Sequence, residues 1–436
     1  MLPLALIAQL AFSDPGWVNA DCPAGQDTTR LRCGWVEVAE DRSRPGGRRI
    51  RLFVMRRDPG PTQHRPDRVP IVFIDGGPGR AATTDAWWAE LVLGSLVATH
   101  PLVFQDQRGT GNSAPLDCDL WPERRTSDRR YPIEAVRRCR EELVPRAALD
   151  AYGTKDAVMD LEAVRRALGV EQLNLYGISY GARVAVGYAL LFPRRVRSMV
   201  LHSPASFARS PEVGRDASRR VFIHAVQGQA PGMPDAVLRR LTNAPLDVPF
   251  TRWSRVDTAR VGPRVGAWLL RDLLYDPGGW EGLRPLLLSL QNRRAGPVVA
   301  AALGDFARSE SGYSVGAFIG IICTEDVPVT PAPITGDWTA VPQEEFAEVC
   351  REWPLAQLPK WWGRAPPPNI PALLISGRWD PVTPADSAAA LARRMGGAHS
   401  LVVQGGGHGG TWECAIRAVE KFVLSGSIAG LPPICR

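Results

Sequence analysis

Short apolar runs alternate with amphipathic stretches along the first half of the chain. Residues 33–40 and 49–57 each alternate apolar and polar positions on either side of a Pro- and Gly-containing stretch, which predicts a β-hairpin. Residues 69–75 and 101–106 are continuous apolar runs, as expected for strands covered on both faces of a parallel sheet. The first part of the chain therefore predicts a sheet that begins with a hairpin.

The alternation continues, stops and then resumes. Helical spacing over 154–169 leads into further strand and helix patterns, which cover 172–177, 180–193 and 195–205. Residues 206–365 are rich in Arg, Trp and Pro and show short helical patterns but no strong strand. The remaining expected elements are strands at 371–377 and 400–404 and helices at 386–395 and 411–424.

This order predicts one α/β domain with a mostly parallel sheet flanked by helices. Residues 21–205 and 366–436 are expected to form the two parts of that core. Residues 206–365 are expected to form a mostly helical insertion between them.

A serine between two glycines lies where a predicted strand meets a predicted helix. The stretch Gly177-Ile178-Ser179-Tyr180-Gly181 has the pattern Gly-x-Ser-x-Gly, which is typical of a nucleophile elbow. That turn is sharp, so the flanking residues must be small. It exposes the serine hydroxyl beside a helix N-terminus, which favours developing negative charge. Ser179 is therefore the candidate nucleophile.

Two downstream residues complete the expected catalytic set. A serine hydroxyl needs a base to remove its proton, and the base needs an acid to orient it. In this kind of fold the chain order is Ser, then Asp or Glu, then His. Asp380 and His408 each follow a predicted strand in that order, whereas His202 precedes the acid and is interpreted as a pocket or packing residue. A turn residue and an ordinary loop histidine are the competing interpretations of Asp380 and His408.

Hydrolysis also needs donors for the negative charge that develops on the carbonyl oxygen. One is expected to be the backbone N–H of Tyr180, the residue after the nucleophile. The other should come from the loop after an earlier strand, where the sequence reads DGGPG, so Gly77 is the candidate. A plain turn is the competing interpretation, because Gly-Pro-Gly is common turn chemistry.

The composition of the chain limits the classes of molecule that it is expected to bind. The 436 residues carry a formal net charge of +7, but the cations are scattered arginines that are not interleaved with aromatic residues, which argues against nucleic-acid binding. The eight cysteines show no zinc-binding spacing, so no metal or other cofactor is expected. No apolar stretch reaches membrane-spanning length. We expect a peptide or a small ester as the substrate, and nothing in the sequence fixes the oligomeric state.

Cysteine spacing and the N-terminus both indicate export. An even count of cysteines in neighbouring couples indicates local disulfides and an oxidising compartment, although eight cysteines allow 105 pairings and eight reduced thiols are the alternative. The couples are Cys22 and Cys33, Cys118 and Cys139, Cys323 and Cys350, and Cys414 and Cys435. Residues 1–20 resemble a signal segment for a periplasmic or secreted protein, with 18–20 as a small-residue cleavage site. No Lys or Arg precedes the apolar run, so a misassigned start or a buried strand is the alternative.

Five stretches give the chain a resemblance to a known family. They are GGPG at 76–79, DQRGTGNS at 106–113, GISYGA at 177–182, GRWDPVTP at 377–384 and GGHG at 406–409. In this order they resemble the α/β-hydrolase serine peptidases of the prolyl aminopeptidase and tripeptidyl aminopeptidase type, in their TAP-like branch. The resemblance implies an α/β-hydrolase fold with a cap over the active site, and release of residues from a free peptide N-terminus. Asp106 and Arg108 are expected to brace the loops beside the site.

The resemblance also implies that carboxylates of the cap hold the substrate ammonium group. The stretch at 320–328 resembles the cap segment of the TAP-like branch, so Glu325 and Asp326 are the candidates. A solvated acidic turn next to a cystine is the alternative. Two departures leave the substrate open: Asp75 stands where prolyl aminopeptidases carry His, and Arg80 stands where the TAP-like branch carries Gly.

The sequence therefore predicts an exported serine hydrolase that acts through an acyl-enzyme on Ser179, with His408 and Asp380. An aminopeptidase or tripeptidyl peptidase is the first hypothesis, and a carboxylesterase or lactone hydrolase with the same triad is the alternative. A catalytically silent binding protein of the same fold is a third hypothesis, which the complete set of three residues argues against. An epoxide hydrolase or dehalogenase would need Asp at position 179.

Overall fold

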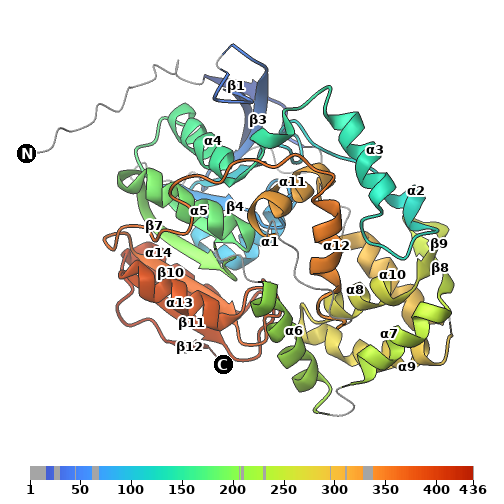
Figure 1. Ribbon diagram of the computed structural model, residues 1–436. Coiled ribbons are helices and arrows are strands. Elements are labelled where there is room, and N and C mark those ends of the chain that lie inside the picture. The colour runs from blue at the N-terminus through green and yellow to red at the C-terminus, as the bar shows by residue number, and fades with distance from the viewer. Residues whose placement is uncertain are drawn as a thin grey trace, which may run out of the picture.

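The computed structural model describes residues 16–23, 30–44, 46–60, 68–205, 207, 211–228, 232–294, 296–309, 312–327 and 337–435. Its centre is a ten-stranded sheet (Figure 1). In sheet order the strands are β1 (Trp17–Ala20), β2 (Leu31–Ala39), β3 (Arg49–Arg57), β5 (Leu102–Gln105), β4 (Ile71–Ile74), β6 (Leu173–Ile178), β7 (Val196–His202), β10 (Ala372–Gly377), β11 (Ala398–Val403) and β12 (Ile434–Cys435). From β5 to β12 every pairing is parallel, and the hairpin β2–β3 joins the edge antiparallel. The α/β architecture with a mostly parallel sheet is confirmed.

Helices cover both faces of the sheet because its parallel strands are apolar on both sides. Along β4, Ile71 and Phe73 pack into one buried cluster, and Val72 and Ile74 pack into the other. The first cluster is covered by α1 (Ala86–Leu93) and α14 (Glu413–Ser425), and the second by α4 (Thr154–Ala167), α5 (Tyr180–Leu191) and α13 (Ala385–Met395). This alternation fixes the register of the strands, since a shift by one residue would exchange the two faces.

A separate group of elements follows β7 and forms the cap (Figure 1). It comprises α6 (Pro211–Ala225), α7 (Met233–Asn243), β8 (Leu246–Arg252), β9 (Arg255–Val261), α8 (Pro263–Leu273), α9 (Leu283–Gln291), α10 (Pro297–Ser309), α11 (Val315–Glu325) and α12 (Val341–Val349). Strands were not expected here, but β8 and β9 pair as an antiparallel hairpin. Leu246, Val248 and Phe250 of β8 are buried, so a period of two was present and was obscured by Pro249, which is exposed between them.

A second part of the cap comes from a segment before Ser179 in the chain, which the sequence did not reveal. Between β5 and α4, the helices α2 (Trp121–Arg124) and α3 (Ile133–Leu143) lie on the same side of the molecule as the cap (Figure 1). Their side chains share one buried apolar cluster with Trp268 and Phe306 of the cap. After α12 the chain returns over α5, where Trp361 packs against the core cluster. The cap therefore combines elements from both sides of the nucleophile in sequence.

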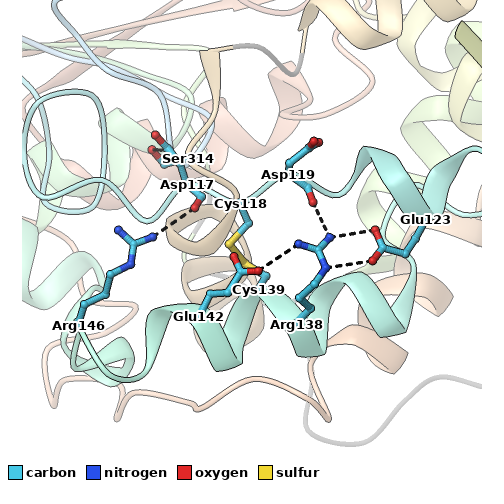
Figure 2. The surroundings of a disulfide bond; sticks show 9 residues. All are labelled: Asp117, Cys118, Asp119, Glu123, Arg138, Cys139, Glu142, Arg146 and Ser314. Atoms are coloured by element: carbon cyan, nitrogen blue, oxygen red, sulfur yellow. Dashed lines mark hydrogen bonds and ion pairs between the residues drawn. A yellow bond between two sulfur atoms is a disulfide. The ribbon is translucent and has the colours of Figure 1, made fainter.

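Four disulfides join the neighbouring cysteine couples, with Cα–Cα distances of 5.1–5.9 Å. The bond between Cys118 and Cys139 ties the segment before α2 to α3 (Figure 2). In the same view Arg138 of α3 forms two hydrogen bonds to Glu123 of α2 and one to the Asp119 carbonyl. These bonds hold α2 and α3 together.

The expected signal segment falls mostly outside the described residues, which begin at 16. The proposed cleavage site at 18–20 lies within the edge strand β1, which pairs with β2. In the part of the chain that the structure describes, no helix combines the length and the apolar character needed to cross a bilayer.

Candidate active site

Ser179 lies on a sharp turn between β6 and α5. Its backbone has φ 52° and ψ −117°, a strained conformation for a residue with a side chain. A Cβ atom on Gly181 would stand 2.0 Å from the Ile74 carbonyl oxygen, and one on Gly177 would stand 2.5 Å from the Gly181 carbonyl oxygen. Gly181 therefore lets the turn pack directly on β4, and Gly177 lets the end of β6 approach the first turn of α5.

His408 and Asp380 reach Ser179 from the ends of two other strands. Nε2 of His408 lies 3.2 Å from Oγ of Ser179, and Nδ1 lies 2.8 Å from Oδ2 of Asp380. Asp380 follows β10 and His408 follows β11, as expected from the sequence. The His408 backbone N–H donates to the Tyr275 carbonyl at 2.7 Å, so the cap also holds this loop.

Asp380 is buried in a shell of donors. Its carboxylate accepts hydrogen bonds from the backbone of Val382 and Thr383 and from the Thr383 hydroxyl, in addition to His408. Burial alone would raise the pKa of Asp380, but the neighbouring His408 and these hydrogen bonds hold that pKa below its usual value. Sequence reasoning did not find Thr383, although a threonine three residues after an acid at a strand end is a common turn arrangement.

The glycine-rich loop after β4 faces the same serine. A Cβ on Gly76 would meet Cβ of Ser179 at 3.0 Å, and Gly77 has φ +105°. Gly77, Ser179 and Tyr180 line one cavity. Tyr180 is the first residue of α5, where a backbone N–H has no acceptor within the helix. Both expected donor residues are thus brought next to the serine.

The loop after β5 is braced as the sequence indicated. The Asp106 carboxylate accepts hydrogen bonds from Thr83 and from the Asn112 backbone. The Arg108 guanidinium is buried and makes two hydrogen bonds of 2.7 Å to Asp160 of α4.

Asp75 and Arg80, the two departures from the family pattern, lie close together. The Asp75 carboxylate is buried with Oδ2 4.0 Å from Nε of Arg80, while Arg80 donates to Asp85 at 2.6 Å. Burial and the nearby Asp85 carboxylate raise the pKa of Asp75 to about 8. Asp75 is therefore protonated near neutral pH, next to the loop that carries Gly77.

The structure separates the two cap carboxylates that were expected to bind substrate. Glu325 is buried, accepts two hydrogen bonds of 2.7 Å from Thr154, and pairs with Arg183 at 2.9 Å. It does not line the cavity, whereas Asp326 does. Asp326 pairs with the same arginine at 2.6 Å, and its side chain is 33% exposed. Glu325 is thus a partner of Arg183 on α5, and only Asp326 faces the space beside Ser179.

The cavity above Ser179 has a volume of about 540 Å³. Aromatic rings from the cap and from α5 form much of its wall, namely Tyr131, Tyr180, Trp268, Tyr275, Tyr313, Phe318 and Phe346. Sequence reasoning gave none of the cap members of this wall, because they come from four separate segments. Arg271 also lines the cavity and was not expected.

His202 is buried among aromatic rings below the site. Its Nδ1 lies 2.9 Å from the Tyr176 hydroxyl, and its ring stacks on Trp88 at a centroid distance of 5.8 Å. Burial lowers the pKa of His202 to about 3, so it stays neutral. Among the residues that the structure describes, no cluster of His, Cys, Asp and Glu has a metal-binding arrangement.

A comparison with family models agrees with the fold. A family described as "alpha/beta hydrolase fold" matches residues 69–243, and a family described as "TAP-like protein" matches residues 337–431. A tripeptidyl aminopeptidase of Streptomyces coelicolor is 31% identical over 228 residues, which cover 47% of this chain but only 41% of that protein. The serine protease Hip1 of Mycobacterium tuberculosis is 25% identical over 458 aligned positions, which cover 91% of this chain and 85% of that protein. The crystal structure of proline iminopeptidase from Mycobacterium smegmatis aligns with a TM-score of 0.44 and 16% identity, over 87% of this chain and 96% of that one.

Proposed function

We propose that this chain, which has the α/β-hydrolase fold and whose C-terminal part matches the TAP-like proteins, is a serine peptidase that removes residues from free peptide N-termini. The observation that carries the proposal is the hydrogen-bonded series from Asp380 through His408 to Ser179, together with the position of Ser179 on the wall of a cavity large enough for a short peptide. The relatives named as tripeptidyl aminopeptidase and serine protease support the same class of reaction.

In the proposed reaction Ser179 attacks the scissile carbonyl while His408 Nε2 removes its proton. Asp380, 2.8 Å from Nδ1, holds the imidazole in the orientation that this transfer needs and stabilises the imidazolium. His408 then gives the proton to the leaving amine. Water hydrolyses the acyl-enzyme with His408 as the base again.

The tetrahedral intermediate carries its negative charge on the former carbonyl oxygen. The backbone N–H groups of Gly77 and Tyr180 are the proposed donors to that oxygen, and the N-terminus of α5 adds a favourable dipole. A donor of this kind is worth about 3 kcal/mol of transition-state stabilisation.

Asp326 is the proposed anchor for the substrate ammonium group. Glu325 and Asp326 share a single arginine, Arg183, so together the three side chains carry a net negative charge that Asp326 presents to the cavity when both carboxylates are ionised. Arg183 lies one helical turn after Ser179 on α5, which places this charge near the nucleophile.

An esterase or lactone hydrolase with the same triad is the second candidate. The observation that favours it is that only one carboxylate of the expected pair lines the cavity. We further propose that the protein is exported, because four disulfides are expected to persist only in an oxidising compartment.

A paired rate comparison tests the function. Fluorogenic peptides with free N-termini, their acetylated counterparts and a short-chain p-nitrophenyl ester are given to the wild-type protein and to Ser179→Ala. We expect hydrolysis of free peptides, loss of hydrolysis on acetylation, and no turnover by Ser179→Ala with an unchanged Tm. Ester cleavage without any peptide cleavage would assign the protein to the esterases, and turnover retained by Ser179→Ala would refute the triad.

A further inference from the structure

The cavity carries more positive than negative side chains. Its six arginines are Arg124, Arg130, Arg183, Arg215, Arg271 and Arg351. Among the described residues three carboxylates line it: Asp326, which pairs with Arg183, Glu348, which pairs with Arg264, and Glu344. Two of the arginines also have carboxylate partners outside the cavity lining, because Arg130 pairs with Asp272 and Arg183 pairs with Glu325.

Arg271 differs from the paired arginines of the cavity in its surroundings. It lies in the last turn of α8, partly buried, with its guanidinium 5.2 Å from the ring centroid of Trp268 and 5.6 Å from that of Tyr275. No carboxylate among the described residues pairs with it: the nearby Asp272 pairs with Arg130. The two rings hold the guanidinium in place, yet its planar set of N–H donors, which matches a carboxylate, has no anion to bind.

Arg271 lies on the side of the cavity where the leaving group passes. The ring of Tyr275 contacts the ring of His408 at a centroid distance of 5.5 Å, and the Tyr275 carbonyl accepts the His408 backbone N–H. Arg271 is therefore one aromatic ring away from His408. In the proposed reaction His408 protonates the leaving amine, so the part of the substrate after the cut bond lies beside this histidine.

We propose that Arg271 binds a carboxylate on the leaving-group side of the cut bond, and that the enzyme consequently prefers peptides that are acidic there. This inference rests on the proposed peptidase function and names a substrate class for it. The carboxylate has two sources, an Asp or Glu side chain after the cut bond or the free C-terminus of a short peptide. Both present the planar pair of oxygens that an arginine binds with two hydrogen bonds.

A purely structural role for Arg271 makes a different prediction. A cation in the last turn of a helix stabilises that helix by complementing its dipole. In that case, replacing Arg271 would lower the Tm and would change the rates for acidic and neutral substrates by the same factor.

The experiment compares matched peptides. Mass spectrometry of the products from an alanine pentapeptide amide first locates the cut bond. The residue after that bond is then Asp in one peptide amide and Asn in its match. A second pair has its C-terminus directly after that residue, as the free acid or as the amide, with alanine throughout. The wild-type protein is expected to show a kcat/KM about ten-fold higher for the acidic member of at least one pair, as expected for a charge-assisted hydrogen bond in a partly buried site.

Variants then assign the preference to Arg271. Arg271→Gln should reduce the ratio between acidic and neutral peptides to about one, and Arg271→Lys should restore part of it because the charge returns without the planar geometry. Arg393→Gln, which removes an exposed arginine of α13 outside the cavity, is the control and should keep the full ratio.

Each outcome supports or refutes the proposed role of Arg271. Cleavage of the neutral peptides without preference for either acidic partner, or a ratio that Arg271→Gln leaves unchanged, refutes the role of Arg271 and leaves the peptidase function standing. Failure to cut any free peptide refutes the proposed function, and the inference falls with it. A preference for the Asp pair alone or for the free-acid pair alone identifies the source of the carboxylate.

Discussion

Glu325 and Asp326 are neighbours in sequence, and we predict that their amide variants fail in different ways. Both side chains pair with Arg183, but Glu325 is buried against Thr154 while Asp326 faces the cavity. The perturbations are Glu325→Gln and Asp326→Asn, each of which removes one charge and keeps the shape of the side chain. Since the two positions share one arginine and one helix end, each variant is the matched control for the other.

The loss in Asp326→Asn should appear in substrate binding. A hydrogen bond between charged groups contributes about 1.5–3 kcal/mol. The 33% exposure of Asp326 and its sharing with Arg183 reduce this figure to about 1–2 kcal/mol. We therefore expect KM for free-amine peptides to rise by about 5- to 30-fold, with little change for acetylated substrates or for the ester.

The loss in Glu325→Gln should appear in stability. Removing one partner of a buried ion pair costs about 3–5 kcal/mol. Because Asp326 still pairs with Arg183, we expect a value near the lower limit, about 3 kcal/mol. At about 2 °C per kcal/mol for a large domain, Tm should fall by about 6 °C, while the ratio of rates on free and acetylated peptides stays close to that of the wild type.

Two measurements on the same protein samples decide this prediction. Thermal unfolding gives Tm for the wild type and both variants, and initial rates on free and acetylated peptides give KM and kcat. An equal rise in KM for free and acetylated peptides in Asp326→Asn would refute its role as the ammonium anchor. A Glu325→Gln variant with wild-type Tm and a selective loss on free peptides would show that the two roles had been exchanged.

Two further predictions concern the scaffold around the site. Because the folded-state pKa of Asp75 is raised to about 8, the folded chain retains a proton there that the unfolded chain has lost above about pH 4. The free energy of unfolding of the wild type should therefore fall relative to that of Asp75→Asn as pH rises from 5 to 8, by up to about 1.4 kcal/mol per pH unit. Parallel curves of Tm against pH for the two proteins would contradict this. Replacing both Cys118 and Cys139 by Ala opens a cross-link with a sequence separation of 21 residues, and the expected loss is about 3 kcal/mol of unfolding free energy. Thermal unfolding checks it, and an unchanged Tm would show that the hydrogen bonds in Figure 2 suffice without the disulfide.

The sheet and the residues at its strand ends could be predicted from the sequence. Continuous apolar runs can be recognised one at a time, and the carboxyl ends of parallel strands meet at one edge of the sheet. Ser179, Asp380 and His408 each follow such a run, so their convergence required only the order of the strands. The cysteine couples were similarly local, because each pair closes a short loop.

The cap could not be predicted in the same way. The buried cluster of the cap joins Trp121 and Tyr131, which precede the nucleophile in the chain, to Trp268 and Phe306, which follow it. The elements that carry these residues bury their apolar sides against one another, so the pattern of any one element does not reveal its partners. The same holds for charge: the family resemblance implied that the acidic pair at the end of α11 binds an ammonium group, but the sequence gave no sign that Arg183 on α5 would pair with both carboxylates.

Arg80, one of the two departures from the family pattern, is held by neighbours on both the core and the cap. An arginine at position 80 would place an unpaired cation beside the site, yet its guanidinium is bound by Asp85 and lies 5.1 Å from the ring centroid of Tyr313. Tyr313 pairs with Arg80 as an isolated β-bridge, and the next residue, Ser314, donates its backbone N–H to the Gly79 carbonyl. Arg80 thus fastens the loop that carries Gly77 to the cap segment preceding α11. The loop of Gly77 is consequently in direct contact with the cap, and we expect a shift of the cap on substrate binding to move this proposed donor.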